Sequence, residues 1–145
     1  QALFDTYAAR VREETRGMRL SEEDFLLRVR QFVSLPSTDV RHPSAHNTGG
    51  AVDLTLIGPD GRELDMGTGF DDFTAAAHTA ALEAGGGPGA RENRRLLYAC
   101  MTAAGFTNLP TEWWHYDYGD AFWSYYTGKP ALYTGILEGD DPYGK

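Results

Sequence analysis

Glycine is the feature that most restricts how this chain can fold. It occurs 17 times among 145 residues, including the runs 49–50 and 85–87. Such frequent breaks indicate many tight turns and argue against a long helical bundle. A chain of this length normally forms one compact domain around one hydrophobic core. We therefore predict that residues 1–145 form a single domain of the α+β class, with a mostly antiparallel sheet and helices packed on one side of it.

Helical patterns occur in four segments. In the first two, apolar side chains recur every three or four residues, and Ser21 followed by three acidic residues is typical of a helix start. The third segment is rich in alanine, and the fourth is followed by Gly105, which suits a left-handed cap. We predict helices over residues 2–16, from Ser21 to Pro36, over 71–83 and over 90–104.

Strand patterns lie in the middle and towards the end of the chain. Residues 51–57 alternate in polarity, so Asp53 lies on one face of a predicted strand. The turn sequence Pro-Asp-Gly at 59–61 predicts a hairpin after this strand. Segment 106–137 is crowded with aromatic residues, which are typical of β-structure. We predict that these strands flank a functional site.

Charge and hydropathy narrow the range of partners. Thirteen basic and twenty-one acidic residues give a formal net charge of −8, which repels nucleic acids and anionic membranes. No apolar run reaches the length of about 20 residues that spans a bilayer. No signal-peptide pattern opens the chain. We expect a cytoplasmic protein, or a periplasmic or secreted one if a leader was removed.

We expect Cys100, the single cysteine, to be a small buried core residue.

Two short clusters carry the residues suited to chemistry. The segment 44–53 contains His46 and Asp53, and the segment 112–115 contains Glu112 and His115. A catalytic zinc ion takes about three protein ligands and keeps one position for water, so two histidines and an aspartate complete a set. The remaining glutamate then suits a general base that takes a proton from zinc-activated water. By spacing alone, a metal site and ordinary hydrogen-bonded histidines are both open.

This hypothesis makes two demands on the backbone. The small residues 48–51 must let the chain fold back so that His46 and Asp53 reach one ion. Glu112 and His115 lie three positions apart, on opposite sides of an ideal strand, so the segment between them must bend. We expect longer side chains in segment 48–51 to crowd the metal.

Four motifs carry a family resemblance. They are SAHNTGGAVDLTL at 44–56, MGTGFDDF at 66–73, RENRRLLYACMTAAGF at 91–106 and EWWHYDYGDAFW at 112–123. In this order they resemble the D-alanyl-D-alanine dipeptidases, the VanX-like zinc peptidases. The resemblance covers about residues 40–125. It implies hydrolysis of D-alanyl-D-alanine, in glycopeptide resistance or in recycling of cell-wall dipeptide, at a zinc site on the sheet.

The resemblance also implies roles for single residues. His46, Asp53 and His115 would bind Zn²⁺, and Glu112 would be the catalytic base. Ser44 and Asp71 would line the dipeptide site, with Asp71 pairing with the free ammonium of the substrate. A carboxylate there would restrict the enzyme to short substrates with a free N-terminus. We expect the two other histidines, His42 and His78, to be exposed or to support the ligands without binding the metal.

One family feature is missing. Relatives carry a Tyr-Arg-Pro segment upstream of the first histidine, and its arginine stabilises the oxyanion; this sequence has no such segment. We expect that the chain starts just beyond it. Loss of a preorganised oxyanion donor costs about 10²–10³-fold in rate, so the chain alone could bind zinc and substrate and hydrolyse slowly.

Two other functions stay open at this level. One is a carboxypeptidase or endopeptidase, of D,D or L,D specificity, that acts on longer peptidoglycan stems with the same metal motif. The other is a catalytically silent, zinc-containing binding module. A small dipeptide is the expected partner, and a homo-oligomer or a separate N-terminal segment could complete the site.

Overall fold

A computed structural model describes residues 2–30, 37, 43–72 and 74–135. Along the chain, the elements are α1 (Ala2–Glu14), α2 (Glu22–Arg30), the 3₁₀ helix η1 (Ala45–Thr48), β1 (Ala51–Asp53), the 3₁₀ helix η2 (Ala75–Ala77), α3 (Pro88–Ala103), β2 (Thr107–Asn108), β3 (His115–Asp117) and α4 (Ala121–Thr127). Within these residues, no helix has the length and apolar character needed to cross a bilayer.

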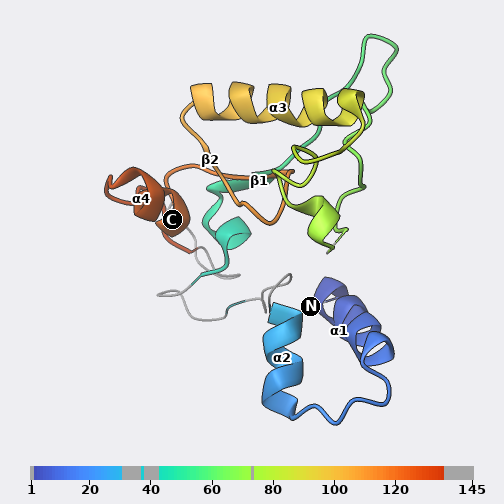
Figure 1. The fold of residues 1–145 in the computed structure, drawn as a ribbon. Coiled ribbons are helices and arrows are strands. Elements are labelled where there is room, and N and C mark those ends of the chain that lie inside the picture. The colour runs from blue at the N-terminus through green and yellow to red at the C-terminus, as the bar shows by residue number, and fades with distance from the viewer. Residues whose placement is uncertain (1, 31–36, 38–42, 73, 136–145) are drawn as a thin grey trace.

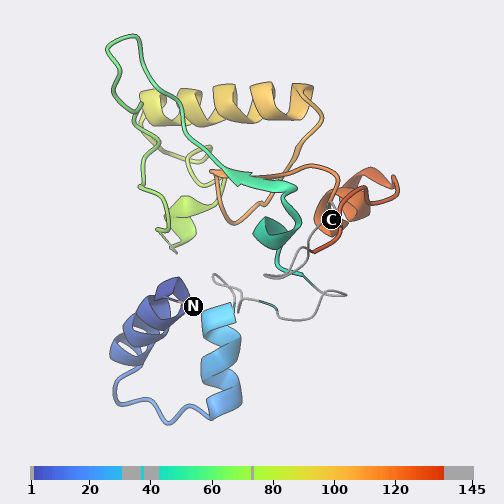
Figure 2. The same cartoon turned by 180° about the vertical axis from the view of Figure 1, so that it is seen from behind.

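The sheet is small and antiparallel, with β3 at its centre. Its order is β1-β3-β2, and Asp53 of β1 lies opposite His115 of β3. Helix α3 runs along one side of it (Figure 1), and the reverse view shows the same arrangement (Figure 2). Helices α1 and α2 contact each other. The predicted α+β class, with an antiparallel sheet and helical packing, is confirmed.

Three predicted elements form where the local signals placed them. The Ser21 hydroxyl accepts a hydrogen bond from the amide of Asp24 at 3.1 Å and caps α2. Helix α3 is followed by Gly105, whose φ of 92° is the predicted left-handed conformation. The amide of Gly58 donates to the carbonyl of Arg62 at 2.7 Å and closes the predicted hairpin. The predicted helix end at Pro36 lies outside the described residues.

The helix predicted over 71–83 is wrong. Only η2 forms there, and Asp71 has a φ of 55° that no right-handed helix contains. The carbonyls of Ala76 and His78 accept hydrogen bonds from the Arg94 side chain, and the carbonyl of Ala77 accepts one from the Trp113 amide. Tertiary hydrogen bonds therefore replace the helical ones, and helix propensity is overridden.

Three further expectations differ from the structure. Segment 121–127 is helix α4, not β-structure, because the carboxylate of Asp120 caps its start at the Trp123 amide, 2.9 Å away. The predicted strand over 51–57 is shortened to β1. Cys100 is exposed, because α3 turns a different face inward. The buried residues of that face are Ala90, Arg94 and Leu97.

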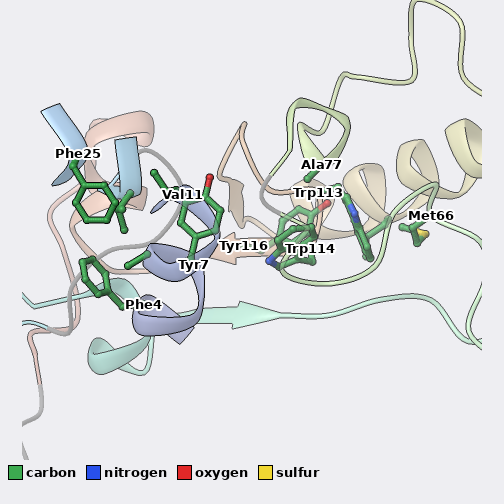
Figure 3. Close-up of a cluster of buried hydrophobic side chains, with 12 residues drawn as sticks. Phe4, Tyr7, Val11, Phe25, Met66, Ala77, Trp113, Trp114 and Tyr116 are labelled. Atoms are coloured by element: carbon green, nitrogen blue, oxygen red, sulfur yellow. The ribbon is translucent and has the colours of Figure 1, made fainter. Parts of the chain in front are cut away.

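The hydrophobic core joins the sheet to distant parts of the chain. Trp114 and Tyr116 are fully buried in and beside strand β3. Figure 3 shows Trp113 and Trp114 gathered near Ala77, with Met66 beyond them. One cluster of buried apolar side chains contains Phe4, Tyr7, Ala8, Val11, Phe25, Val29, Met66, Ala77, Leu97, Trp113, Trp114 and Tyr116. The strand that carries His115 is thus anchored by large apolar side chains on both flanks.

Candidate metal centre

Two histidines and one aspartate converge at one end of the sheet. Each of His46, Asp53 and His115 offers one ligand atom, and these atoms all lie within 4.8 Å of one another. The His46 and His115 ring centroids are 4.8 Å apart, with their planes nearly perpendicular. His78 is not part of this group, and His42 lies outside the described residues.

Strand pairing places two of the three side chains. Asp53 and His115 are directly opposite each other in the antiparallel pair β1–β3, so their side chains share one face of the sheet. The Oδ1 atom of Asp53 is 3.0 Å from Nδ1 of His115, and its Oδ2 atom is 3.4 Å from Nε2 of His46. The aspartate therefore bridges the two imidazoles, with both ring nitrogens aimed at the same space.

The tight turn after η1 brings His46 to this space. Gly49 ends η1 in the left-handed conformation, with a φ of 69°. A Cβ atom on Gly50 would lie 2.7 Å from the carbonyl oxygen of Tyr118, so only glycine fits there. Longer side chains in this segment are expected to crowd the metal. At Gly50, the crowding would instead be against the chain that follows β3.

Glu112 lies beside the group because its segment bends, as the hypothesis demands. The amide of His115 donates to the carbonyl of Glu112 at 3.3 Å, which closes a turn before β3. The Asn108 side-chain amide donates to the same carbonyl at 3.0 Å and to the carbonyl of His115 at 2.9 Å. One carboxylate oxygen of Glu112 is thereby held 3.8 Å from Nδ1 of His115.

The Glu112 carboxyl is an unusually weak acid. Burial raises its pKa from the ordinary 4.5 to about 7, because a charged carboxylate loses hydration there. The positive charge of His115 opposes this rise, while the negative charges of Asp53, Asp71 and Asp117 add to it. A carboxyl with a pKa near neutrality can both accept and return a proton at neutral pH.

Asp117 supports His115 from behind, and the sequence reasoning missed it. Its Oδ1 atom is 3.1 Å from Nε2 of His115, and the side chain is almost completely buried. The available signal was the spacing, because residues two apart on a strand point to the same face. Metal-binding histidines commonly donate their second N–H to a carboxylate, so this contact fits a ligand whose Nδ1 faces the metal.

Protonation of His115 reflects the same contacts. Burial alone favours the neutral ring, but the hydrogen bonds to Asp117 and Asp53 outweigh it and raise the pKa of His115 to about 10. A cation at Nδ1 would take the place of the proton that faces Asp53, while the proton on Nε2 would stay with Asp117. The donor set therefore fits a divalent metal ion.

A second buried carboxyl lies next to Asp117. The Oδ2 atom of Asp117 is buried without a hydrogen-bond donor among the described residues. A protonated Asp120 could supply that donor. Burial raises the pKa of Asp120, the hydrogen bond from the Trp123 amide opposes this, and the neighbouring Asp117 carboxylate raises the pKa further.

The two predicted substrate residues flank the metal group differently. Burial raises the pKa of Asp71, the negative charge of Asp53 raises it further, and His46 lowers it, so the Asp71 carboxyl lies within electrostatic reach of this group. Ser44 directly precedes η1, two residues before His46, and its hydroxyl makes no capping hydrogen bond. Phe70 packs at ring-centroid distances of 5.4 Å and 5.9 Å from Trp113 and Trp114, which gives the loop around Asp71 an apolar support.

This arrangement matches a known peptidase family over most of the chain. A family profile described as D-ala-D-ala dipeptidase matches residues 2–131. The D-alanyl-D-alanine dipeptidase of Escherichia coli is 44% identical over 79 residues, which cover 54% of this chain and 40% of the relative. The D-alanyl-D-alanine dipeptidase of Synechocystis is 31% identical over 113 residues, 72% of this chain and 46% of the relative.

A third relative extends the same pattern. The D-alanyl-D-alanine dipeptidase of Enterococcus faecalis is 34% identical over 98 residues, which cover 67% of this chain and 48% of the relative. The chain thus spans slightly less than half the length of the relatives that it matches.

Proposed function

We propose that this chain, which belongs to the D-ala-D-ala dipeptidase family of peptidases, carries the zinc site of an enzyme that hydrolyses D-alanyl-D-alanine. His46, Asp53 and His115 would bind the zinc ion, and Glu112 would be the general base. The observation that carries this proposal is the convergence of three ligand atoms within 4.8 Å, with a partly buried carboxyl group beside them. Two histidines and one carboxylate are a common catalytic zinc set that leaves a position open.

The chemistry follows from the positions of these groups. When bound, a zinc ion supplies Lewis acidity that polarises the amide carbonyl and makes water a better nucleophile at neutral pH. Glu112 accepts the proton of the attacking water and then returns it to the leaving amine. A pKa near 7 suits both steps, because neither protonation state is strongly disfavoured. Asp117 holds the ring of His115 in one orientation throughout.

Asp71 would select the substrate. Its carboxylate lies on a neighbouring loop within electrostatic reach of Asp53 and His46, where it could pair with the ammonium of a dipeptide. An internal peptide bond offers no such charge, so the carboxylate would remain desolvated and unpaired. Ser44, close to His46 in the chain, would contact the same dipeptide. Selection of a free ammonium favours the dipeptidase over the alternative enzyme that acts on peptidoglycan stems.

We also propose that the chain acts as one domain in this reaction. The buried apolar cluster includes residues from α1, α2, α3 and β3, so the site strand and the N-terminal helices share one core.

The reaction would serve glycopeptide resistance and recycling of cell-wall dipeptide equally well. An arginine that stabilises the oxyanion would come from a segment outside the matched motifs, as the family resemblance implies.

The decisive experiment combines metal analysis with hydrolysis of three substrates by this chain. We expect one zinc ion per chain, cleavage of D-alanyl-D-alanine, and little cleavage of L-alanyl-L-alanine or of a pentapeptide stem. The same assays would be repeated with an upstream Tyr-Arg-Pro segment restored. Stoichiometric zinc without dipeptide cleavage in either form would overturn the proposed activity and support a silent binding module.

A further inference from the structure

Arg94 is a buried cation whose hydrogen bonds go to the backbone of a loop and not to a carboxylate. It lies on the inner face of α3 with 3% of its surface exposed. Its three guanidinium nitrogens donate to the backbone carbonyls of Met66, His78 and Ala76 at 2.7, 2.8 and 2.9 Å. Burying a charge is unfavourable unless hydrogen bonds compensate for the lost water, and these three bonds provide that compensation.

The three carbonyls lie on both sides of Asp71 in the sequence. Met66 precedes it by five residues, and Ala76 and His78 follow it by five and seven. One planar guanidinium therefore joins the two ends of the loop 66–78 and fixes the width of its base. Figure 3 shows that Met66 and Ala77, from the two ends of this loop, lie on either side of the Trp113 ring.

We propose that Arg94 is a positioning residue for substrate recognition, which holds the loop 66–78 so that the Asp71 carboxylate faces the substrate's ammonium. This inference rests on the proposed role of Asp71. Arg94 would touch neither the substrate nor the metal. Its effect would pass through the backbone of the loop, so it would control selection of a free N-terminus without changing metal binding.

Two neighbouring residues fasten the same loop. The Asn93 side-chain amide donates to the carbonyl of Asp65 at 2.8 Å, at the start of the loop. The indole N–H of Trp113 donates to the hydroxyl of Thr68 at 2.9 Å, and the Trp113 amide donates to the carbonyl of Ala77 at 3.1 Å. These bonds fix the ends of the loop, while its tip carries Asp71.

The backbone at Asp71 explains why such fastening is needed. Its φ of 55° lies in the left-handed region, and it is the only described residue other than glycine with a positive φ. Aspartate adopts this conformation more readily than most residues, but it is still less favourable than right-handed or extended backbone, so contacts that hold the loop help to maintain it. If the ends of the loop separate, we expect Asp71 to relax towards an ordinary conformation and its carboxylate to change position relative to the metal group.

Lysine could not replace this arginine fully. The guanidinium presents several donors in one rigid plane, which suits three acceptors around it, whereas an ammonium group is a compact charge on a flexible stem. An Arg94→Lys variant should therefore keep the buried charge but lose part of the fixed geometry. An Arg94→Met variant keeps much of the apolar stem and loses every one of the three hydrogen bonds.

The test measures selectivity by binding, in a Glu112→Gln background that slows turnover. The zinc-loaded chain would be titrated with D-alanyl-D-alanine and with N-acetyl-D-alanyl-D-alanine by calorimetry. A charge-assisted contact to the ammonium should favour the free amine by about tenfold or more. We expect this ratio to fall to within about threefold in R94M, to be intermediate in R94K, and zinc content to remain at one ion per chain.

Two further variants keep the test decisive. Arg95→Met is the matched control, because Arg95 is the next residue on α3 and its guanidinium binds Glu83 at the surface, so the ratio should be unchanged. Thr68→Val removes the hydroxyl that accepts from the Trp113 indole N–H and keeps the shape of the side chain, and it should lower the ratio by a smaller factor. Should R94M not fold, R94K and T68V decide the question by the same ratio.

The outcomes separate this inference from the proposed function. If the parent protein binds both ligands equally, the role of Asp71 fails, and the inference about Arg94 fails with it. If the parent prefers the free amine and R94M retains that preference, Arg94 is only a structural residue. Equal weakening of both ligands in R94M would overturn the inference in the same way, because a general loss of folding leaves the ratio unchanged.

Discussion

The two walls of the candidate site are held by different means. On one wall, Asp53 and His115 lie on paired strands, so backbone hydrogen bonds of the sheet fix their separation. On the other, Asp71 lies on an irregular loop whose ends are fastened by the side chains of Arg94 and Trp113. A substitution can therefore remove the ligands of the first wall without moving its backbone, whereas the second wall depends on single side chains for its shape.

The first prediction removes a ligand from the sheet wall. His115→Ala should abolish stoichiometric zinc binding and activity, because two remaining ligands rarely hold a catalytic zinc ion. The backbone pairing of β1 and β3 should survive, since it does not involve the imidazole. Zinc content after dialysis is the measurement. His78→Ala is the matched control, because His78 lies outside the ligand group and should leave zinc content at one.

The second prediction separates the base from the metal ligands. Glu112→Gln should reduce kcat for D-alanyl-D-alanine by about 10²–10⁴-fold, the usual contribution of a general base. Zinc content should remain at one, because Glu112 is not among the three ligand residues. Steady-state kinetics and metal analysis on the same sample provide the check. Full activity in this variant would refute the assignment of Glu112 as the base.

The sequence predicted the sheet wall better than the loop wall. The residues at positions 46, 53, 112 and 115 could be singled out because zinc chemistry restricts the choice to a few residue types, and the motifs order them along the chain. The required bend before His115 follows from strand geometry alone, and the structure contains it. The support of His115 by Asp117 was not predicted, although the two residues lie two positions apart on a strand and so share a face.

The loop was mispredicted for a physical reason. Residues 71–83 are rich in alanine, and local propensity therefore favours a helix. The carbonyls that a helix would use are bound by Arg94 and by the Trp113 amide, which lie 16 or more positions farther along the chain. Long-range partners of this kind leave no periodic signal. Helix α4 forms in spite of aromatic residues that favour strands, because the Asp120 carboxylate caps its first turn.

The third prediction concerns the stability of the sheet wall without metal. Because the pKa of Glu112 rises on folding from 4.5 to about 7, the folded state binds more protons between these values, and ionisation there lowers the free energy of unfolding. The full stabilisation is present below pH 4.5 and lost above about pH 7, a difference of about 3 kcal/mol.

Chemical denaturation of chelator-treated protein at several pH values tests this linkage. Relative to wild type, Glu112→Gln should gain stability as the pH rises from 4.5 to about 7, and the gain should then level off. Asp60→Asn, a change at an exposed turn, should show no such pH dependence. Parallel stability curves for wild type and E112Q would contradict the buried position of the carboxyl.

The fourth prediction weakens the sheet wall behind its ligand. Asp117→Asn should lower zinc affinity by about 10–100-fold, because loss of a carboxylate that supports a ligating histidine typically has this effect. Metal-free stability should fall less than zinc affinity, because the ion pair with protonated His115 is lost but the new amide oxygen can still accept a hydrogen bond from Nε2 of His115. Competition with a zinc chelator gives the affinity. Equal losses of stability and affinity would show instead that Asp117 serves folding in general.

The last prediction concerns the loop wall and removes one of its side-chain contacts. Thr68→Val keeps the shape of the side chain but leaves the Trp113 indole N–H without its acceptor, which should cost about 1 kcal/mol. Because the sheet wall does not depend on this bond, hydrogen exchange should accelerate in residues 66–78 and stay unchanged in β1 and β3. Thr102→Val is the matched control, since its hydroxyl binds a carbonyl within its own helix. Uniform acceleration across both walls in T68V would mean that they open together, and the distinction between a backbone-held and a side-chain-held wall would then be wrong.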